Sequence, residues 1–226
     1  FYALNSDGDL RFYIETESDI SSEASIIDVE GVGPVIFFAS GNMVYAVDTN
    51  GNSYLDWPIA ANGNVTTSIV FSEVNGQDYA IFGDEAGYVH MCTLAGEPYA
   101  NFPINYGFPF KGTPTIYDID NDGDLEIFIG STQTLVSIDI KESGSTDGYW
   151  NTHRANMQRD GYYISSDYND VVGDTNNDGQ INILDILILV NLIFDSIYNE
   201  YGDINGDGQL NIADCILLVN MILGNY

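Results

Sequence analysis

Oxygen-bearing side chains recur at fixed spacing in two short stretches near the end of this 226-residue chain. Residues 174–185 read D-T-N-N-D-G-Q-I-N-I-L-D, and residues 203–214 read D-I-N-G-D-G-Q-L-N-I-A-D. Each stretch has a carboxylate or amide side chain at loop positions 1, 3, 5, 9 and 12 and a glycine at position 6, the spacing that wraps one chain around Ca²⁺. The two copies in register predict a pair of calcium sites.

A third acidic loop, residues 118–126, lies in the middle of the chain and reads D-I-D-N-D-G-D-L-E. Gly123 permits the sharp turn that converging oxygen atoms need. A solvated acidic hairpin is the alternative, and a third calcium site is the favoured interpretation. The matching stretches of the other repeats contain Glu30 and Glu73 without the full set. No metal is therefore expected there.

The charge of the chain favours cations as ligands. There are 34 acidic and five basic residues, and the net charge is −29. Nucleic acid and anionic membranes are therefore poor partners, whereas divalent cations are good ones. All basic residues lie at or before Arg159, so the chain from Ser165 onward has none. A hydrophobic content of 45% and an aromatic content of 13% argue against disorder.

A repeat of about 45 residues precedes the paired loops. Residues 44–59 align without gaps on residues 89–104, and each is preceded by two β-rich runs. Four short strands per repeat are the sequence form of a propeller blade. Residues 1–14 align with the back half of a repeat. We therefore expect a mainly β N-terminal region of about three and a half four-stranded propeller-type blades, which begins in mid-blade, followed by a small all-α calcium-loop domain.

Three explanations of the half-blade remain open. Further blades precede residue 1, the sheets stack openly, or two subunits complete each other; we favour a C-terminal fragment of a longer protein. The expected domains are residues 1–164 and 171–226, joined by a linker over residues 165–170. Residues 150–163 are expected to close the repeats rather than to bind anions. Cys92 and Cys215 fall in different domains, and two free thiols are favoured over a disulfide.

Each paired loop runs into an apolar segment, residues 183–194 and residues 212–223. Both segments are apolar nearly all round, which predicts helices that are buried against each other or against a partner. Both are too short to span a bilayer, so no membrane insertion is expected.

The repeats over residues 1–164 resemble the quinoprotein-like and integrin-type (FG-GAP-like) repeat propellers of secreted bacterial proteins. This resemblance implies a calcium loop between the first two strands of the third blade. Asp118, Asp120 and Asp122 would then bind through their side chains, Asp124 through its backbone carbonyl, and Glu126 would complete the shell.

The paired loop–helix units, residues 173–224, closely resemble the dockerin family. The resemblance implies two Ca²⁺ ions in the tail, which with the Asp118–Glu126 loop makes about three in the chain, and a tail whose folding depends on calcium. The implied ligands of the first site are Asp174, Asn176, Asp178, the Gln180 carbonyl, Asn182 and Asp185. Those of the second site are Asp203, Asn205, Asp207, the Gln209 carbonyl, Asn211 and Asp214.

Dockerins bind cohesin domains, and in the best-known class a Ser-Thr-type pair at loop positions 10 and 11 is recognised. This chain has apolar residues there, namely Ile183, Leu184, Ile212 and Ala213. The lysine or arginine usually found further along the helix is also missing. An apolar docking face for a cohesin-like partner, or burial against the chain's own propeller, fits this pattern better.

Binding fits the residues better than catalysis. His90 and His153 belong to no motif with a nucleophile, and no phosphate-binding glycine loop follows a strand. We therefore predict a secreted, calcium-dependent docking module with the propeller as scaffold, and no enzyme. The alternative is a structural subunit that assembles with copies of itself into a calcium-stabilised extracellular fibre, attached to the cell surface. The sequon Asn64-Val65-Thr66 marks Asn64 as a glycosylation candidate.

Overall fold

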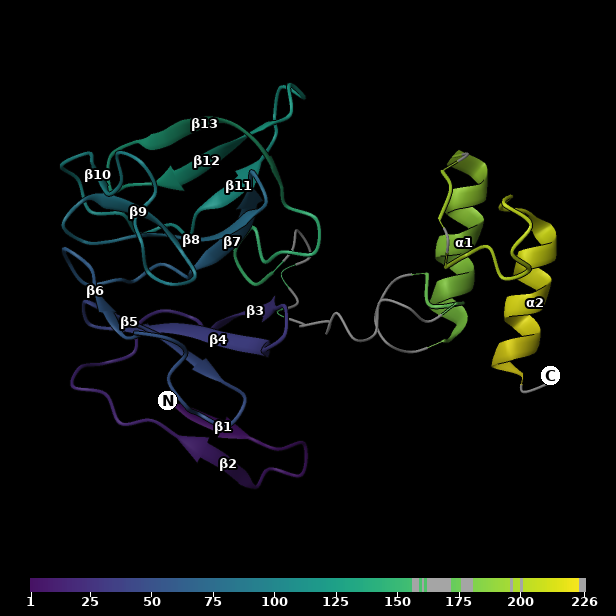
Figure 1. Ribbon diagram of the computed structural model, residues 1–226, viewed down its shortest axis with the longest axis horizontal. Coiled ribbons are helices and arrows are strands. Elements are labelled where there is room, and N and C mark those ends of the chain that lie inside the picture. The colour runs from purple at the N-terminus through teal and green to yellow at the C-terminus, as the bar shows by residue number, and fades with distance from the viewer. Residues whose placement is uncertain are drawn as a thin grey trace. The chain divides into compact units, whose positions relative to one another are not determined.

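The structure is a computed structural model (Figure 1), which describes residues 1–155, 159, 161, 172–175, 181–195, 197–199 and 201–223. The chain divides into two compact units, Phe1–Tyr163 and Ile164–Tyr226, which we name the β unit and the helical unit. Among the described residues, every strand lies in the first unit and both α-helices lie in the second. The predicted fold class, a mainly β N-terminal region with a small all-α domain, is confirmed.

The β unit contains three antiparallel sheets that follow one another along the chain. The first sheet pairs β1 (Tyr2–Leu4) with β2 (Leu10–Tyr13). The second sheet has the order β3 (Ser25–Val29), β4 (Gly33–Ser40), β5 (Met43–Asp48) and β6 (Ile59–Ala60). The third sheet begins with the same meander, formed by β7 (Val70–Val74), β8 (Gln77–Gly83), β9 (Tyr88–Thr93) and β10 (Ile104–Asn105). Two successive four-stranded meanders are the topology of propeller blades.

The third repeat departs from this plan because it has three strands. These are β11 (Thr115–Tyr117), β12 (Asp124–Gly130) and β13 (Leu135–Ser145). The end of β13 pairs with β7, with Gly144 opposite Val74, so the second and third repeats share one seven-stranded sheet. A four-stranded third blade was expected. The strand that would have been its outer edge is replaced by this link back to the second repeat.

Residues just beyond β13 close two strand edges. The Phe71 N–H donates to the Trp150 carbonyl at 2.8 Å, and the Ile116 N–H donates to the Asn151 carbonyl at 2.9 Å. Trp150 also packs against the core of the β unit. The first strands of two neighbouring repeats, β7 and β11, are therefore bridged by one short segment.

Apolar side chains fill the space between successive sheets. One buried cluster joins the second and third sheets, and in it Phe37 contacts Trp57 and Phe71 edge to face, with both ring centroids 5.1 Å away. A second cluster joins the second and third repeats. Gly83 lies at this contact, and a Cβ there would approach Ile129 Cδ1 to 2.5 Å. A residue without a side chain is therefore needed for the two repeats to come this close.

The first sheet is covered on one side only. Phe1 stacks on Phe38 of β4 with ring centroids 4.4 Å apart, which attaches this sheet to its neighbour. Tyr2 is 73% exposed and Leu4 is 61% exposed. The two strands present an open apolar surface, whose large exposed residues are Tyr2, Leu4, Leu10 and Tyr13.

The helical unit consists of α1 (Ile183–Asp195) and α2 (Ile212–Ile222) with the segments that precede them. Its fully buried apolar cluster contains only Leu189, Cys215 and Leu218 among the described residues. Cys92 of the β unit and Cys215 are both buried free thiols. Across the described residues, neither helix is long and apolar enough to cross a bilayer.

Candidate functional site

In the loop before α2, side-chain oxygen atoms accept hydrogen bonds from backbone N–H groups of the same loop. Asp203 accepts the Asp207 N–H on Oδ1 at 3.0 Å and the Gly208 N–H on Oδ2 at 2.7 Å. Asn205 Oδ1 accepts the Asp207 N–H at 2.9 Å. Positive φ angles at Gly206 and Gly208 permit this tight path. Asn205 Nδ2 donates to Asp207 Oδ2 at 3.0 Å, which joins the side chains at loop positions 3 and 5.

The end of this loop also starts the helix. Asn211 Oδ1 accepts the Ala213 N–H at 2.8 Å, and Asp214 Oδ2 accepts the Asn211 N–H at 2.9 Å, which together form a capping box. Asp214 Oδ1 accepts the Asn205 N–H at 3.3 Å. Position 12 of the loop therefore both caps α2 and faces back toward position 3.

The loop before α1 repeats this arrangement where it is described. Asn182 Oδ1 accepts the Leu184 N–H at 2.9 Å, and Asp185 Oδ2 accepts the Asn182 N–H at 2.8 Å. Thr175 Oγ1 donates to the Asp185 carbonyl at 2.8 Å, which ties the start of the loop to its end. The predicted ligands Asn176, Asp178 and Gln180 lie outside the described residues.

Buried carboxylates are numerous in the helical unit. Asp174, Asp185, Asp203 and Asp214 are all buried, and Asp185 and Asp214 have no exposed surface. Burial raises the pKa of Asp203, but hydrogen bonds from Gly208 and the Tyr198 hydroxyl outweigh it and leave the pKa below its usual value. The unit contains no lysine, arginine or histidine in its sequence. Buried carboxylates in a unit without basic residues suit a bound cation.

Both helices expose apolar side chains at equivalent positions. Ile183 is 67% exposed and its counterpart Ile212 is 71% exposed, while Leu187 and its counterpart Ile216 are each 57% exposed. Leu184 is exposed as well, whereas Ala213 is half-buried. We name these side chains the helix faces, one on each helix: Ile183, Leu184 and Leu187 on α1, and Ile212 and Ile216 on α2.

The acidic loop between β11 and β12 brings all five predicted residues together. Carboxylate oxygens of Asp118, Asp120 and Asp122 lie within 4.8 Å of one another, and so do those of Asp120, Asp124 and Glu126. Asp118 accepts the N–H groups of residues 122 and 123, which gives the loop its turn. Asp120 belongs to both groups. The arrangement suits a hard cation that prefers oxygen ligands.

Asp124 carries an unsatisfied atom in this loop. Its Oδ1 is buried and has no hydrogen-bond partner within the described residues, which is the type of group that a bound cation would satisfy. A hydrogen bond with Asp122, burial and the charge of Asp122 raise the pKa of Asp124 to about 6. Sequence reasoning assigned Asp124 a backbone carbonyl role. The carboxylate itself lies among the candidate ligands.

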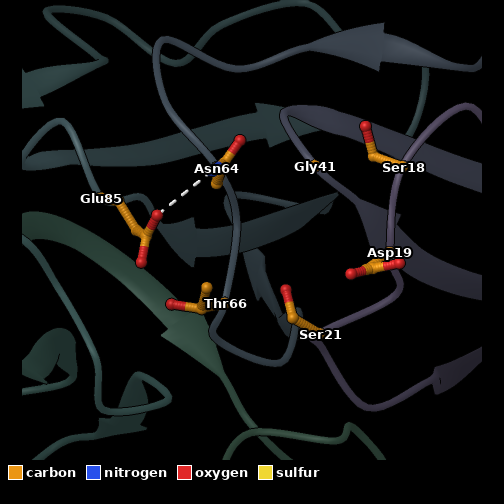
Figure 2. Close-up of a pocket in the computed structure, with 7 residues that line it drawn as sticks. All are labelled: Ser18, Asp19, Ser21, Gly41, Asn64, Thr66 and Glu85. Carbon is orange, nitrogen blue, oxygen red and sulfur yellow. Dashed lines mark hydrogen bonds between the residues drawn. The ribbon is translucent and has the colours of Figure 1, made fainter.

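A polar pocket in the β unit had no sequence signal (Figure 2). Its volume is about 520 Å³, and it is lined by Ser18, Asp19, Ser21, Gly41, Asn64, Thr66 and Glu85. Asn64 Nδ2 donates to Glu85 Oε2 at 3.2 Å, and the Thr66 hydroxyl is buried without a partner among the described residues. Glycan attachment to Asn64 would use this nitrogen and leave it one N–H to donate.

His90 and Cys92 line a second cavity, of about 370 Å³. The buried Asp84 carboxylate contacts His90 Nε2 at 2.9 Å and accepts the N–H groups of Gly63 and Tyr88, each at 3.0 Å. Burial raises the pKa of the Cys92 thiol to about 12, which makes it a poor nucleophile. We interpret the Asp84–His90 pair as a structural polar centre that joins the β8–β9 turn to the preceding linker.

Comparisons with known proteins found one family match and one structural similarity. Residues 172–223 match the family described as the dockerin type I domain. Among solved structures, the chain is similar to BamB from Moraxella catarrhalis, with 19% sequence identity and a TM-score of 0.44. That similarity covers 62% of this chain and 39% of the BamB chain. No curated protein matches the sequence.

Proposed function

We propose that this chain is a calcium-dependent docking module that acts outside the cell. Its dockerin type I domain, residues 172–223, would bind two Ca²⁺ ions and dock onto a cohesin-like domain. The β unit would serve as a scaffold, with a third Ca²⁺ in the Asp118–Glu126 loop. Both roles are binding roles, and neither requires catalysis.

The observation that carries this proposal is the set of buried acids in the helical unit. Asp203 and Asp214 are buried in a unit whose sequence has no lysine, arginine or histidine. Removing a charge from water costs several kcal/mol unless a partner compensates. Two Ca²⁺ ions, one in each loop, supply this compensation and make folding depend on calcium.

The helix faces support docking through apolar contacts. A lone small domain gains nothing from exposing Ile183, Leu187, Ile212 and Ile216 to water, and apolar patches of this kind mark interaction sites. The equivalent register on α1 and α2 offers two similar faces. A cohesin-like partner with an apolar surface and a basic rim would complement these faces and the acidic loops beside them.

Binding of the full chain to a panel of cohesin domains tests this function, measured by titration calorimetry with millimolar CaCl₂ and with EGTA. The double variants Ile183→Ser/Leu187→Ser and Ile212→Ser/Ile216→Ser are each expected to weaken binding about tenfold or more if the partner buries that face. Leu135→Ser is the matched control, because Leu135 is 73% exposed but lies in the β unit. Binding that survives EGTA, or that ignores both double variants, would rule out the proposed mode.

Self-assembly is a second candidate, and the open surface of β1 and β2 favours it. Tyr2 and Leu4 are exposed at 73% and 61% on a two-stranded sheet that packs on one side only. A second copy of the chain would bury this surface. Sedimentation velocity over a range of concentrations should then show calcium-supported oligomers that Tyr2→Ser/Leu4→Ser abolishes. A monomer at all concentrations argues against the fibre.

A further inference from the structure

β13 joins two repeats, and it does so directly beside the acidic loop. Within β12 and β13, Asp124 is opposite Ser143. The Gly144 N–H donates to the Gly123 carbonyl at 3.3 Å, and the Asn75 N–H, from the β7–β8 turn, donates to the Ser143 carbonyl at 2.9 Å. The backbone of the loop is therefore bonded to the residues at which β13 changes partner from β12 to β7. We name Ser143–Ser145 the junction.

Lys141 occupies an unusual position next to the junction. Its backbone has φ of +59°, in the left-handed region that lysine rarely adopts, at an irregularity in the pairing of β12 with β13. Its Nζ lies 3.7 Å from Asp124 Oδ2 and also contacts Asp139. The bulge thus directs the ammonium group toward the carboxylate whose other oxygen, Oδ1, has no hydrogen-bond partner in the described part of the chain.

Negative charge is concentrated at this corner. Glu126 is paired directly opposite Asp139 across the two strands, and like charges opposite each other destabilise a sheet. Asp118, Asp120, Asp122 and Asp124 add to this charge within the loop. Among the described side chains, Lys141 is the basic residue that contacts the cluster.

We propose that Lys141 and a divalent cation compete for Asp124, and that occupancy of the loop by the cation fixes the junction between β12, β13 and β7. Lys141 then sets the calcium affinity of the loop, and the loop controls how firmly the third repeat is held to the second. This inference rests on the third calcium site in the proposed function. It goes beyond that site by assigning a tuning residue and a structural consequence.

Lys141→Gln in the full chain tests the competition. The amides of Gly144 and Asn75 report the junction by hydrogen exchange, and CaCl₂ is titrated as the only ligand. Loss of one positive charge a few ångströms from a divalent ion is expected to raise the affinity about three- to tenfold at low salt, and the gain should shrink as ionic strength rises. Lys111→Gln is the matched control, because Lys111 pairs with Glu85 in another part of the unit.

Three outcomes are distinguishable in this experiment. Calcium-dependent protection of Gly144 and Asn75, strengthened by Lys141→Gln and lost in Asp122→Asn, supports the inference. Calcium binding with equal affinity in wild type and Lys141→Gln overturns it while leaving the third site intact. No calcium-dependent protection in any variant overturns the inference, and if Asp122→Asn also leaves the number of bound calcium ions unchanged, the third site is overturned as well. The amide of Val65, which bonds to Gly41 away from the loop, should be unaffected throughout.

Discussion

The β unit and the helical unit hold their folds by different means. In the β unit, large apolar side chains such as Phe37, Phe71 and Phe82 are fully or almost fully buried between sheets. In the helical unit the buried apolar cluster is small, and Asp185 and Asp214 are as deeply buried as any apolar residue. Apolar burial stabilises a fold in any buffer, whereas a cluster of buried carboxylates is expected to need a bound cation. The comparison therefore predicts a self-sufficient part and an ion-dependent part in one chain.

Calcium removal should separate the two units most clearly. Excess EGTA is expected to abolish the helical circular dichroism at 222 nm, because the paired carboxylates then repel one another without a counter-ion. Both tryptophans of the chain, Trp57 and Trp150, lie in the β unit, so their fluorescence should report little change. Asp214→Asn should reproduce part of the loss in the presence of calcium. Retention of the full helical signal in EGTA would show that the helical unit folds without calcium.

Truncation of the apolar core should destabilise the β unit and leave the helical unit unchanged. Phe37→Ala is expected to lower the free energy of unfolding of the β unit by about 3–5 kcal/mol, because it leaves a cavity against Trp57 and Phe71. Urea unfolding followed by tryptophan fluorescence measures this loss. Phe194→Ala in α1 is the control, since that side chain is 80% exposed. A calcium-dependent effect of Phe37→Ala would show that the units are not independent.

The buried Asp84 gives the β unit a smaller, acid-sensitive contribution. Burial raises its pKa, but hydrogen bonds from His90, Tyr88 and Gly63 outweigh burial and lower the pKa below its usual value. The stabilisation is therefore complete above the unfolded pKa of about 4 and is lost as pH falls through the depressed folded pKa. Asp84→Asn should lower the free energy of unfolding at pH 7 by about 1.5–3 kcal/mol.

The pH profile checks the sign of that contribution. Stability of the variant should fall less than that of wild type as the pH is lowered from 5 to 3. Asp147→Asn, on an exposed loop, should match wild type at every pH. Equal acid sensitivity of Asp84→Asn and wild type would show that the Asp84 carboxylate does not cause the loss of stability at low pH.

Local patterns were readable from the sequence. The order of oxygen-bearing residues predicted the loops, and Asn182 and Asn211 cap the helices at the positions where the apolar segments begin. The strand repeats were equally readable, because period-two apolar runs and turn residues depend on neighbours in the chain. Contacts between residues close in sequence can therefore be predicted from the local residue pattern.

Non-local features were missed. Nothing in residues 143–145 indicates pairing with β7, because that pairing depends on how two repeats meet in space. The left-handed φ of Lys141 breaks the usual preference of lysine, so composition gave no hint of its approach to Asp124. The pocket around Thr66 is assembled from separate linkers and turns, and no single stretch encodes it.

The lack of any lysine, arginine or histidine in the helical unit has a consequence for when this unit can fold. Without bound calcium, the proposed ion dependence predicts that the mutual repulsion of its acids keeps the helical unit unfolded. Millimolar calcium is then expected to fold it. The ion would therefore set the moment at which this end of the chain becomes able to bind a partner.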